Sequence, residues 1–438
     1  MLGGVFSPKS LAGFMAMLDR NRLIFTVVAS FAAFSCYFCM YAFRRPFAAG
    51  TYDEAGFGLA IGGRMIEAKT LFLIAQVIGY CASKFLGVKF CSEIPRDRLG
   101  RALLTCIAAS WLALLGFAVA PPAWKTVAIF LNGLPLGVVW GLVVRYLEGR
   151  KVSELLLAAL SCSYILASGE VKRTGAWLLE MGVGEYWMPF TTGAIFLLPF
   201  AASVGLLSLL PPPSAEDEML RTRRQVMTRG DRLAFARRFL PGLVLLLSFY
   251  LALTAYRDFR DSFQADLFLE MGITDAAAFS RTERPIAFGV LALLGIAFLV
   301  KGARRGLATV CLLMVAGMVV LGVSTLLYGK GRIGGETWMM VGGFGAYLAY
   351  VPFGSVLFDR VIAATRFAGT AVFAIYLADA LGYSGSVGVM IYRDIFAAEA
   401  SRLEFFRGFS LWLAAGGLPL LLGGAVYFLG RAKRAPGT

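Results

Sequence analysis

Charged and phenolic side chains stand inside apolar stretches of this chain, at spacings that would bring them together on helices. Tyr37, Tyr41 and Arg44 close the apolar run 23–44 at positions i, i+4 and i+7, which share one helical face. A guanidinium at the end of a segment suited to lipid is costly unless it faces protein or a water-filled cavity. We therefore regard Arg44 as a candidate ligand for an anion. The alternative is that Arg44 and Arg45 mark the outer end of the helix and reach the membrane interface.

A denser cluster of charge runs from Tyr256 to Gln264, in the order Tyr-Arg-Asp-Phe-Arg-Asp-Ser-Phe-Gln. Arg257 and Arg260 share a helical face, and Asp258 and Asp261 can pair with arginines on the same helix or across the bundle. A charge at the centre of a bilayer costs about 2.5–3.5 kcal/mol even on a lenient insertion scale. These charges therefore either end the helix or line a wet cavity. We favour the cavity, because apolar residues continue beyond them.

Further polar positions lie within apolar spans. Tyr80 and Lys84 are four residues apart in the second span, and we expect Lys84 to point inward rather than toward the inner membrane surface. Tyr164 belongs to a polar face of the fifth span. Asp379 lies about 12–13 residues from either end of the eleventh span, too deep to reach the surface. We expect Asp379 to pair with a basic residue of another span or to carry a proton.

The composition places these residues in a membrane. The chain has 438 residues, of which 58% are hydrophobic and 16% charged, with a mean hydropathy of +0.73, values typical of a polytopic membrane protein. The net charge of +15 comes from basic residues clustered between apolar spans, where they set topology, so the lipid bilayer rather than nucleic acid is the expected partner. The chain has no histidine, and its seven cysteines lie within or at the ends of spans. We therefore predict no metal site and no cofactor, and the absence of nucleophile and phosphate-loop motifs predicts that the protein is not an enzyme.

Twelve apolar spans organise the chain into two halves of six helices. The predicted spans are 23–44, 68–90, 102–120, 124–147, 154–178, 186–210, 239–265, 284–300, 306–328, 336–358, 367–392 and 408–430. The fifth, seventh and eleventh are the least apolar. Lysine and arginine counts between spans place both termini in the cytoplasm. The predicted organisation is an N-terminal half 1–210, a cytoplasmic linker 211–238 and a C-terminal half 239–438.

A faint internal repeat supports this organisation. The run Phe43-Arg44-Arg45-Pro46-Phe47 ends the first span, and Phe259-Arg260-Asp261-Ser262-Phe263 occupies the same place in the seventh. Related six-span halves with a binding site at their interface are typical of secondary transporters. The predicted fold class is an all-α polytopic membrane protein of twelve transmembrane helices in two pseudo-symmetric halves.

Several of these residues resemble motifs of the major facilitator superfamily, and within it the organophosphate:inorganic phosphate antiporters. Tyr41 with Arg44-Arg45-Pro46-Phe47 looks like the first-span motif of the glycerol-3-phosphate transporter branch. Tyr80-Cys81-Ala82-Ser83-Lys84-Phe85 is similar to its second-span motif, and Gly137-Val138-Val139-Trp140 with Arg145 to its fourth-span motif. The resemblance implies that Arg44 grips a phosphoryl group, that Lys84 lies in the substrate site, and that Arg257 or Arg260 is the second phosphate-gripping arginine. Tyr164 stands where that family has a histidine.

These observations predict a secondary active transporter of a small organic anion in a bacterial inner membrane. The cargo would be a phosphorylated metabolite exchanged for phosphate or coupled to protons, with Asp258, Asp261 and Asp379 as charge-pair or coupling residues. Guanidinium groups and an ammonium would hold the anion, and Tyr37, Tyr41, Tyr80 and Tyr164 would donate hydrogen bonds. We expect a monomer. The alternatives are a membrane sensor that does not transport, and a cation or drug exporter with Asp379 and Asp258 as its acidic site.

Overall fold

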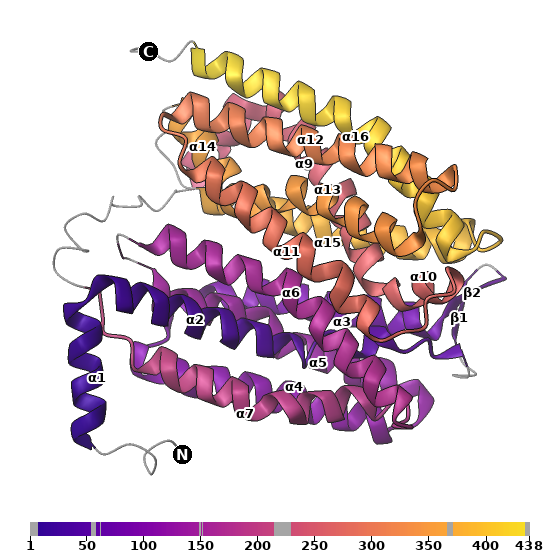
Figure 1. Cartoon of the computed structure of the whole chain (residues 1–438), viewed down its shortest axis with the longest axis horizontal. Coiled ribbons are helices and arrows are strands. Elements are labelled where there is room, and N and C mark those ends of the chain that lie inside the picture. The colour runs from indigo at the N-terminus through magenta and orange to yellow at the C-terminus, as the bar shows by residue number, and fades with distance from the viewer. Residues whose placement is uncertain are drawn as a thin grey trace. The chain divides into compact units, whose positions relative to one another are not determined.

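The computed structural model describes residues 8–53, 58–61, 63–148, 150, 152–213, 229–365 and 371–433, and all structural statements concern these residues. They form long helices and one two-stranded hairpin, made of β1 (Gly58–Ile61) and β2 (Arg64–Glu67) (Figure 1). The chain divides into two compact units. Unit 1 comprises Met1–Leu59 and Glu67–Thr222, and unit 2 comprises Ala60–Ile66 and Arg223–Thr438.

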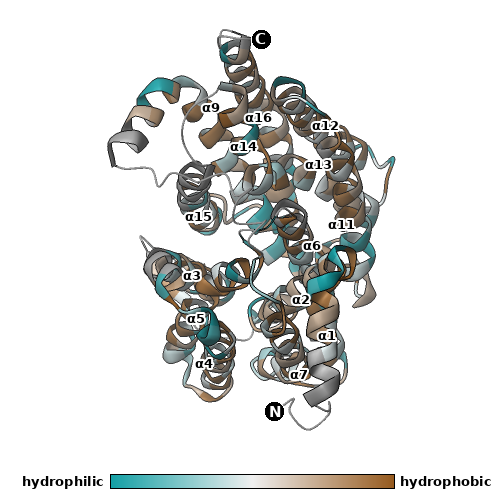
Figure 2. Cartoon of the chain, turned by 90° about the vertical axis from the view of Figure 1, so that its left-hand side faces the viewer, coloured by the Kyte–Doolittle hydropathy of each residue, from teal (hydrophilic) through white to brown (hydrophobic). Residues whose placement is uncertain are grey.

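Unit 1 packs its membrane helices in two rows of three, preceded by the short α1 (Pro8–Arg20). One row has α5 (Pro122–Leu147) between α3 (Ala68–Glu93) and α4 (Leu99–Val119), and the other has α2 (Arg22–Tyr41) between α6 (Ser153–Glu180) and α7 (Met188–Ser208) (Figure 2). Glycines let α3 and α5 approach closely. A Cβ atom at Gly133 or Gly137 of α5 would collide with the backbone of Gln76 or Tyr80 on α3. This close packing fixes the height of Tyr80 in the unit.

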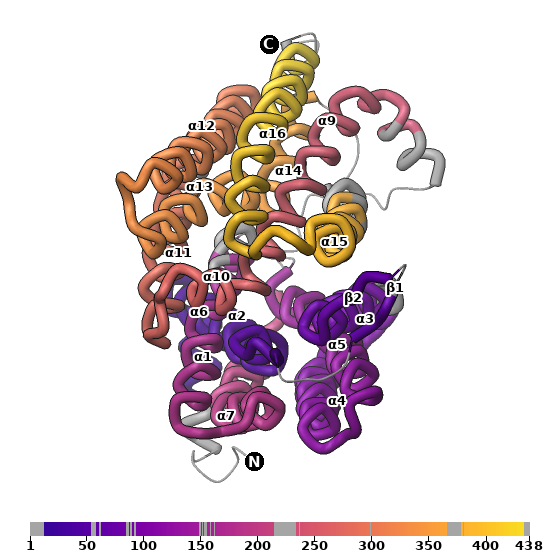
Figure 3. Tube along the Cα trace, turned by 90° about the vertical axis from the view of Figure 1, so that its right-hand side faces the viewer, coloured from indigo at the N-terminus to yellow at the C-terminus, as the bar shows by residue number. Residues whose placement is uncertain are grey.

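Unit 2 repeats the arrangement. In one row α13 (Gly335–Ser355) lies between α11 (Ala277–Phe298) and α12 (Ala303–Gly329), and in the other α9 (Arg229–Ser262) lies between α15 (Ala371–Phe396) and α16 (Arg402–Lys433) (Figure 3). Two short helices, α10 (Gln264–Glu270) and α14 (Leu357–Thr365), follow α9 and α13. By their contacts α2 matches α9, α3 matches α11 and α5 matches α13, so both units have one helical plan.

The helices confirm the predicted fold class of an all-α polytopic membrane protein. Among the described residues, seven helices are long and apolar enough to cross a membrane by themselves, and α13 with α14, bent by 54°, makes an eighth. The remaining long helices α3, α6, α11 and α15 have 26, 28, 22 and 26 residues, enough to cross a hydrocarbon core. The seventh predicted span (α9), expected to be among the least apolar, is one of the seven apolar helices, because its charges gather at its C-terminal end.

Several helices begin or end at other residues than the predicted spans do. Helix α2 ends at Tyr41, and Arg44 lies in the turn that follows, because Pro46 starts a short 3₁₀ helix and disfavours α-helix in the residue before it. Helix α9 ends at Ser262 and begins at Arg229, inside the predicted linker; residues 214–228 of that linker lie outside the described residues. Helix α11 begins at Ala277, before the predicted start at 284.

Candidate functional site

The turn that carries Arg44 is held by buried amide side chains. The backbone N–H groups of Arg44 and Arg45 both donate to the carbonyl of Tyr41, at 3.0 and 2.9 Å. Gln76 Nε2 donates to the Arg44 carbonyl at 2.9 Å and to Asn132 Oδ1 at 2.7 Å, and Asn132 Nδ2 donates to the Phe43 carbonyl at 2.9 Å. Gln76 and Asn132 are 2% and 0% exposed. Satisfied amide bonds of this kind are strong in a dry interior, so the backbone under Arg44 is fixed.

The guanidinium of Arg44 lies over an aromatic ring. Its Cζ atom is 3.9 Å from the ring centroid of Tyr80 and 5.9 Å from that of Tyr41. Tyr37 packs edge-on against Tyr41 at 5.7 Å, and the Lys84 ammonium is 5.3 Å from the Tyr80 ring. The structure therefore brings together, within unit 1, five of the residues predicted for the site. The N–H donors of a stacked guanidinium lie in its plane, in a geometry that matches an oxyanion.

Tyr164, the sixth predicted residue of unit 1, lies on α6 and is partly buried. Its helical neighbours Ser168 and Lys172 are buried at 2% and 0% exposure, so this face of α6 is turned toward protein. The assignment of Tyr164 to the site stays a prediction.

In unit 2, Arg257 is stacked on a tyrosine and anchored by a neighbouring carboxylate. Its Cζ atom is 4.2 Å from the ring centroid of Tyr350 on α13. Its Nε and Nη2 atoms both donate to Asp258 Oδ1, and the Ser386 hydroxyl donates to Asp258 Oδ2 at 2.7 Å. The Asp258 side chain is 2% exposed and that of Arg257 is 14% exposed. Arg257 is thus oriented by Asp258, while part of its side chain remains accessible.

Arg260 has a different environment, although it lies only one turn further along α9. Its Nη1 atom is 2.8 Å from Glu283 Oε1 on α11, and both side chains are 1% exposed. Its Nη2 atom donates to the Met339 carbonyl at 2.9 Å, and Gln264 Nε2 donates to the same Glu283 oxygen at 3.1 Å. This buried, hydrogen-bonded ion pair ties α9 to α11 and α13. The structure therefore separates the two arginines that the sequence left equivalent.

Glu283 is the residue that sequence reasoning missed. The predicted eighth span started at 284, one residue after Glu283. A signal was present: an arginine as deep in a helix as Arg260 requires an acidic partner on a neighbouring helix.

The predicted coupling residues Asp379 and Asp261 also lie in unit 2. Asp379 of α15 is partly exposed, and its Oδ1 atom is 3.1 Å from the hydroxyl of Tyr250 on α9. The Tyr250 hydroxyl is 3.2 Å from that of Tyr350, and the two rings stack at 5.4 Å. Asp261 is buried at 5% exposure near Tyr347. The carboxylate of Asp379 is thereby connected to the ring on which Arg257 lies.

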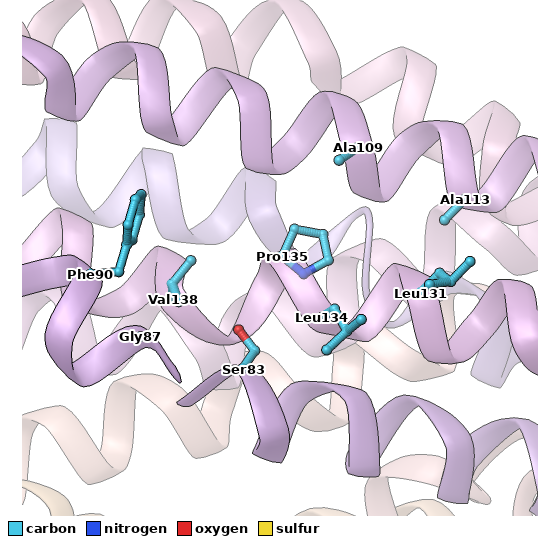
Figure 4. A pocket seen from close by; sticks show the side chains of 9 residues that line it. All are labelled: Ser83, Gly87, Phe90, Ala109, Ala113, Leu131, Leu134, Pro135 and Val138. Atoms are coloured by element: carbon cyan, nitrogen blue, oxygen red, sulfur yellow. The ribbon is translucent and has the colours of Figure 1, made fainter. Parts of the chain in front are cut away.

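Unit 1 also has a pocket that is lined mainly by apolar residues, unlike the charged sites described above. It has a volume of about 710 Å³ and lies where α3 and α4 flank α5 (Figure 4). Its lining is Ser83, Gly87, Phe90, Ala109, Ala113, Leu131, Leu134, Pro135 and Val138. An apolar lining of this kind suits hydrocarbon rather than a charged ligand. No group of three His, Cys, Asp or Glu side chains in the described part of the chain could hold a metal ion.

Solved structures of secondary transporters share the fold of this chain. The nucleoside transporter NupG aligns over 92% of this chain and 98% of its own at 12% identity, with a TM-score of 0.61. A bacterial homologue of the human drug peptide transporters PepT1 and PepT2 aligns over 94% and 98% at 11% identity, with a TM-score of 0.63. The proton:xylose symporter XylE, of the major facilitator superfamily, aligns over 95% and 97% at 14% identity, with a TM-score of 0.55. The fold is therefore of the major facilitator type.

The chain belongs to the DUF5690 family, described as a family of unknown function, whose model matches residues 46–431. No curated protein matches the sequence.

Proposed function

We propose that this protein is a secondary active transporter of a small organic anion that works by alternating access. The observation that carries the proposal is that each unit holds an arginine over a tyrosine ring of a long helix. Arg44 lies over Tyr80 in unit 1, and Arg257 lies over Tyr350 in unit 2. Membrane-embedded cations are costly, and their usual justification is a ligand or an ion pathway. The fold shared with transporters supports the same role.

The chemistry favours an oxyanion such as a phosphorylated metabolite. A guanidinium presents paired N–H donors that match two oxygens of a phosphate or carboxylate. Lys84, close to the Tyr80 ring, adds a second positive charge in unit 1. Tyrosine hydroxyls supply neutral donors at the same place. Exchange against inorganic phosphate, as the resemblance to organophosphate antiporters implies, fits this donor set.

We assign different roles to the arginines of α9. Arg257 takes part in anion binding, because its side chain is partly accessible and Asp258 orients it. Arg260 holds α9 against α11, because its partner Glu283 lies on that other helix and both side chains are only 1% exposed. Each unit thus has one arginine that we assign to anion binding.

Phosphate exchange in proteoliposomes tests the proposal. Liposomes loaded with phosphate should take up labelled phosphate with saturable kinetics, and Arg44→Ala and Arg257→Ala should each reduce this uptake at least tenfold. Arg281→Gln is the matched control, because Arg281 lies in an exposed ion pair with Glu336 at 49% side-chain exposure and should leave uptake unchanged. Phosphate binding without flux would support a sensor instead. Uptake of a lipophilic cation that depends on Asp379 and Asp258, with no effect of anions, would support an exporter.

Topology and assembly are part of the same proposal. Both termini would lie in the cytoplasm of a bacterial cell with the chain monomeric in its inner membrane. Reporter fusions at the two termini, and light scattering of the purified protein, test these statements.

A further inference from the structure

The apolar pocket of unit 1 opens on the face of the α3–α5–α4 row that is turned away from α2. Leu131, Pro135 and Val138 line it from one face of α5. Asn132, which holds the turn after α2, and Leu136 lie on the other face of α5 and are buried. Leu131 is 49% exposed, so the pocket is open to the surroundings of the helices. In a polytopic membrane protein an open apolar face of this kind meets hydrocarbon.

The pocket lies at the depth of the hydrocarbon core. Ser83, in its lining, is 15 residues after the start of α3 at Ala68 and 10 residues before its end at Glu93. At 1.5 Å per residue these distances are about 22 and 15 Å along the helix. The headgroups and ester groups of phospholipids stay at the two interfaces, so only acyl chains and molecules dissolved in the core reach this depth.

Two polar groups at the pocket lack an ordinary hydrogen-bond partner. The Ser83 side chain is 4% exposed, and Figure 4 shows its oxygen turned into the pocket. The Ser83 hydroxyl makes no hydrogen bond with the described part of the chain. Pro135 has no N–H group, so the carbonyl of Leu131, which lies beside the proline ring, loses its usual donor within α5. A polar group without a hydrogen bond is unfavourable in a dry environment, so the pocket favours a molecule that supplies the missing bonds.

A hydroxyl group matches both of these polar groups. A Cβ atom on Gly137 would be 2.9 Å from Ser83 Oγ, which places the Ser83 hydroxyl two residues from Pro135 along α5. A serine hydroxyl can donate, whereas a carbonyl oxygen only accepts, so one ligand hydroxyl can accept from Ser83 and donate to Leu131. An acyl chain would fill the same space without supplying either bond.

We propose that this pocket binds a lipophilic alcohol, a membrane-dissolved molecule with an apolar body and a hydroxyl group at the height of Ser83. The volume of about 710 Å³ lies in the range of small-molecule sites. The small residues Gly87, Ala109 and Ala113 leave room for the apolar body between α3 and α4. This site is separate from the proposed anion site and does not depend on it.

Photolabelling of the purified full chain in micelles tests the proposal. The probe is a long-chain alcohol with a diazirine in its chain, and its methyl ether is the matched probe that cannot donate a hydrogen bond. Peptides of α3, α4 and α5 at the pocket should be labelled about three to ten times more strongly by the alcohol than by the ether, as the loss of one hydrogen bond predicts.

Three variants locate the bound alcohol. Ser83→Ala should reduce labelling by the alcohol by a similar factor, and Ala109→Phe should abolish it by filling the pocket. Leu112→Phe is the control, because Leu112 lies on α4 with 61% exposure and outside the pocket lining, and it should be labelled like wild type.

The comparison of the two probes on the wild-type chain does not depend on the folding of any variant. Equal labelling by the alcohol and the ether would overturn the proposal, because apolar contact alone would then account for the binding. Labelling that is spread over the exposed faces of the helices, with no preference for the pocket, would also overturn it. Phosphate exchange in proteoliposomes is measured separately, so either result leaves the proposed anion transport standing.

Discussion

Removing the carboxylate of Glu283 should destabilise unit 2 far more than removing an exposed carboxylate at the same distance from an arginine. Arg260 and Glu283 lie 2.8 Å apart, so at an effective dielectric constant of about 20 their attraction is about 6 kcal/mol. Desolvation of the two ions offsets part of this in the intact pair. Glu283→Ala keeps the cost of burying Arg260 and loses its partner, which typically lowers the free energy of unfolding by ~3–5 kcal/mol.

The control is an exposed ion pair between α11 and α13. Arg281 Nε and Glu336 Oε1 are also 2.8 Å apart, but the side chains are 49% and 37% exposed. Water screens this pair, so Glu336→Ala should leave the unfolding midpoint close to that of wild type. The double variant Arg260→Met, Glu283→Leu removes both buried charges and should recover most of the lost stability.

The assay is reversible unfolding in mixed micelles titrated with sodium dodecyl sulfate, followed by tryptophan fluorescence. A Glu283→Ala midpoint equal to that of Glu336→Ala would refute the assignment of Arg260 as a helix-tying residue. In that case the guanidinium would have to find another partner, and it would return as a candidate anion ligand.

Three further predictions concern unit 1. Tyr80→Leu removes the ring beneath Arg44 and should weaken phosphate binding by about two- to thirtyfold, equivalent to ~0.5–2 kcal/mol of cation–π attraction, whereas Tyr80→Phe should retain most of the affinity in the same binding assay. Asn132→Leu leaves the carbonyl of Phe43 buried without its donor, so the free energy of unfolding should fall by about 1–3 kcal/mol in the micelle titration, and phosphate affinity should fall with it. Burial beside the Glu185 carboxylate raises the pKa of Tyr52, in the turn before β1, well above its ordinary value, so the ring stays neutral in the fold. Unfolding stability should therefore be constant below the ordinary tyrosine pKa of about 10 and decline above it, and Tyr52→Phe should lessen this decline in alkaline unfolding curves.

The sequence predicted the helices well because apolar length is a local property. It also found the deep charges, since an arginine or aspartate within an apolar run is visible without any structure. Helix ends were harder to predict: the run to Arg44 looked continuous, but Pro46 ends α2 at Tyr41. The sequence did not show which side chains the two arginines of α9 contact. Arg257 and Arg260 have similar neighbours along the chain. Only the packing of α11 and α13 against α9 gives Arg260 a carboxylate from another helix and gives Arg257, already paired with Asp258, a ring.

Because both units have the same helical plan, the partners of arginines at matching positions can be compared. Arg44 after α2 and Arg260 at the end of α9 occupy matching places in the repeated sequence, and α3 matches α11. The partner of Arg44 on α3 is the ring of Tyr80, whereas the partner of Arg260 on α11 is the carboxylate of Glu283. Both arginines are buried, but Arg260 is tied to another helix by an ion pair, whereas Arg44 is stacked on a ring. In unit 2 the ring contact has moved one helical turn back along α9, to Arg257 and Tyr350, and the carboxylate that pairs with Arg257 is its neighbour Asp258 on the same helix. The arginine that we propose for anion binding in unit 2 is therefore oriented by its own helix, and the one that we propose in unit 1 is held on a fixed turn by Gln76 and Asn132. On this reasoning, Lys84→Ala should lower phosphate uptake into proteoliposomes, because it removes a positive charge beside the Tyr80 ring.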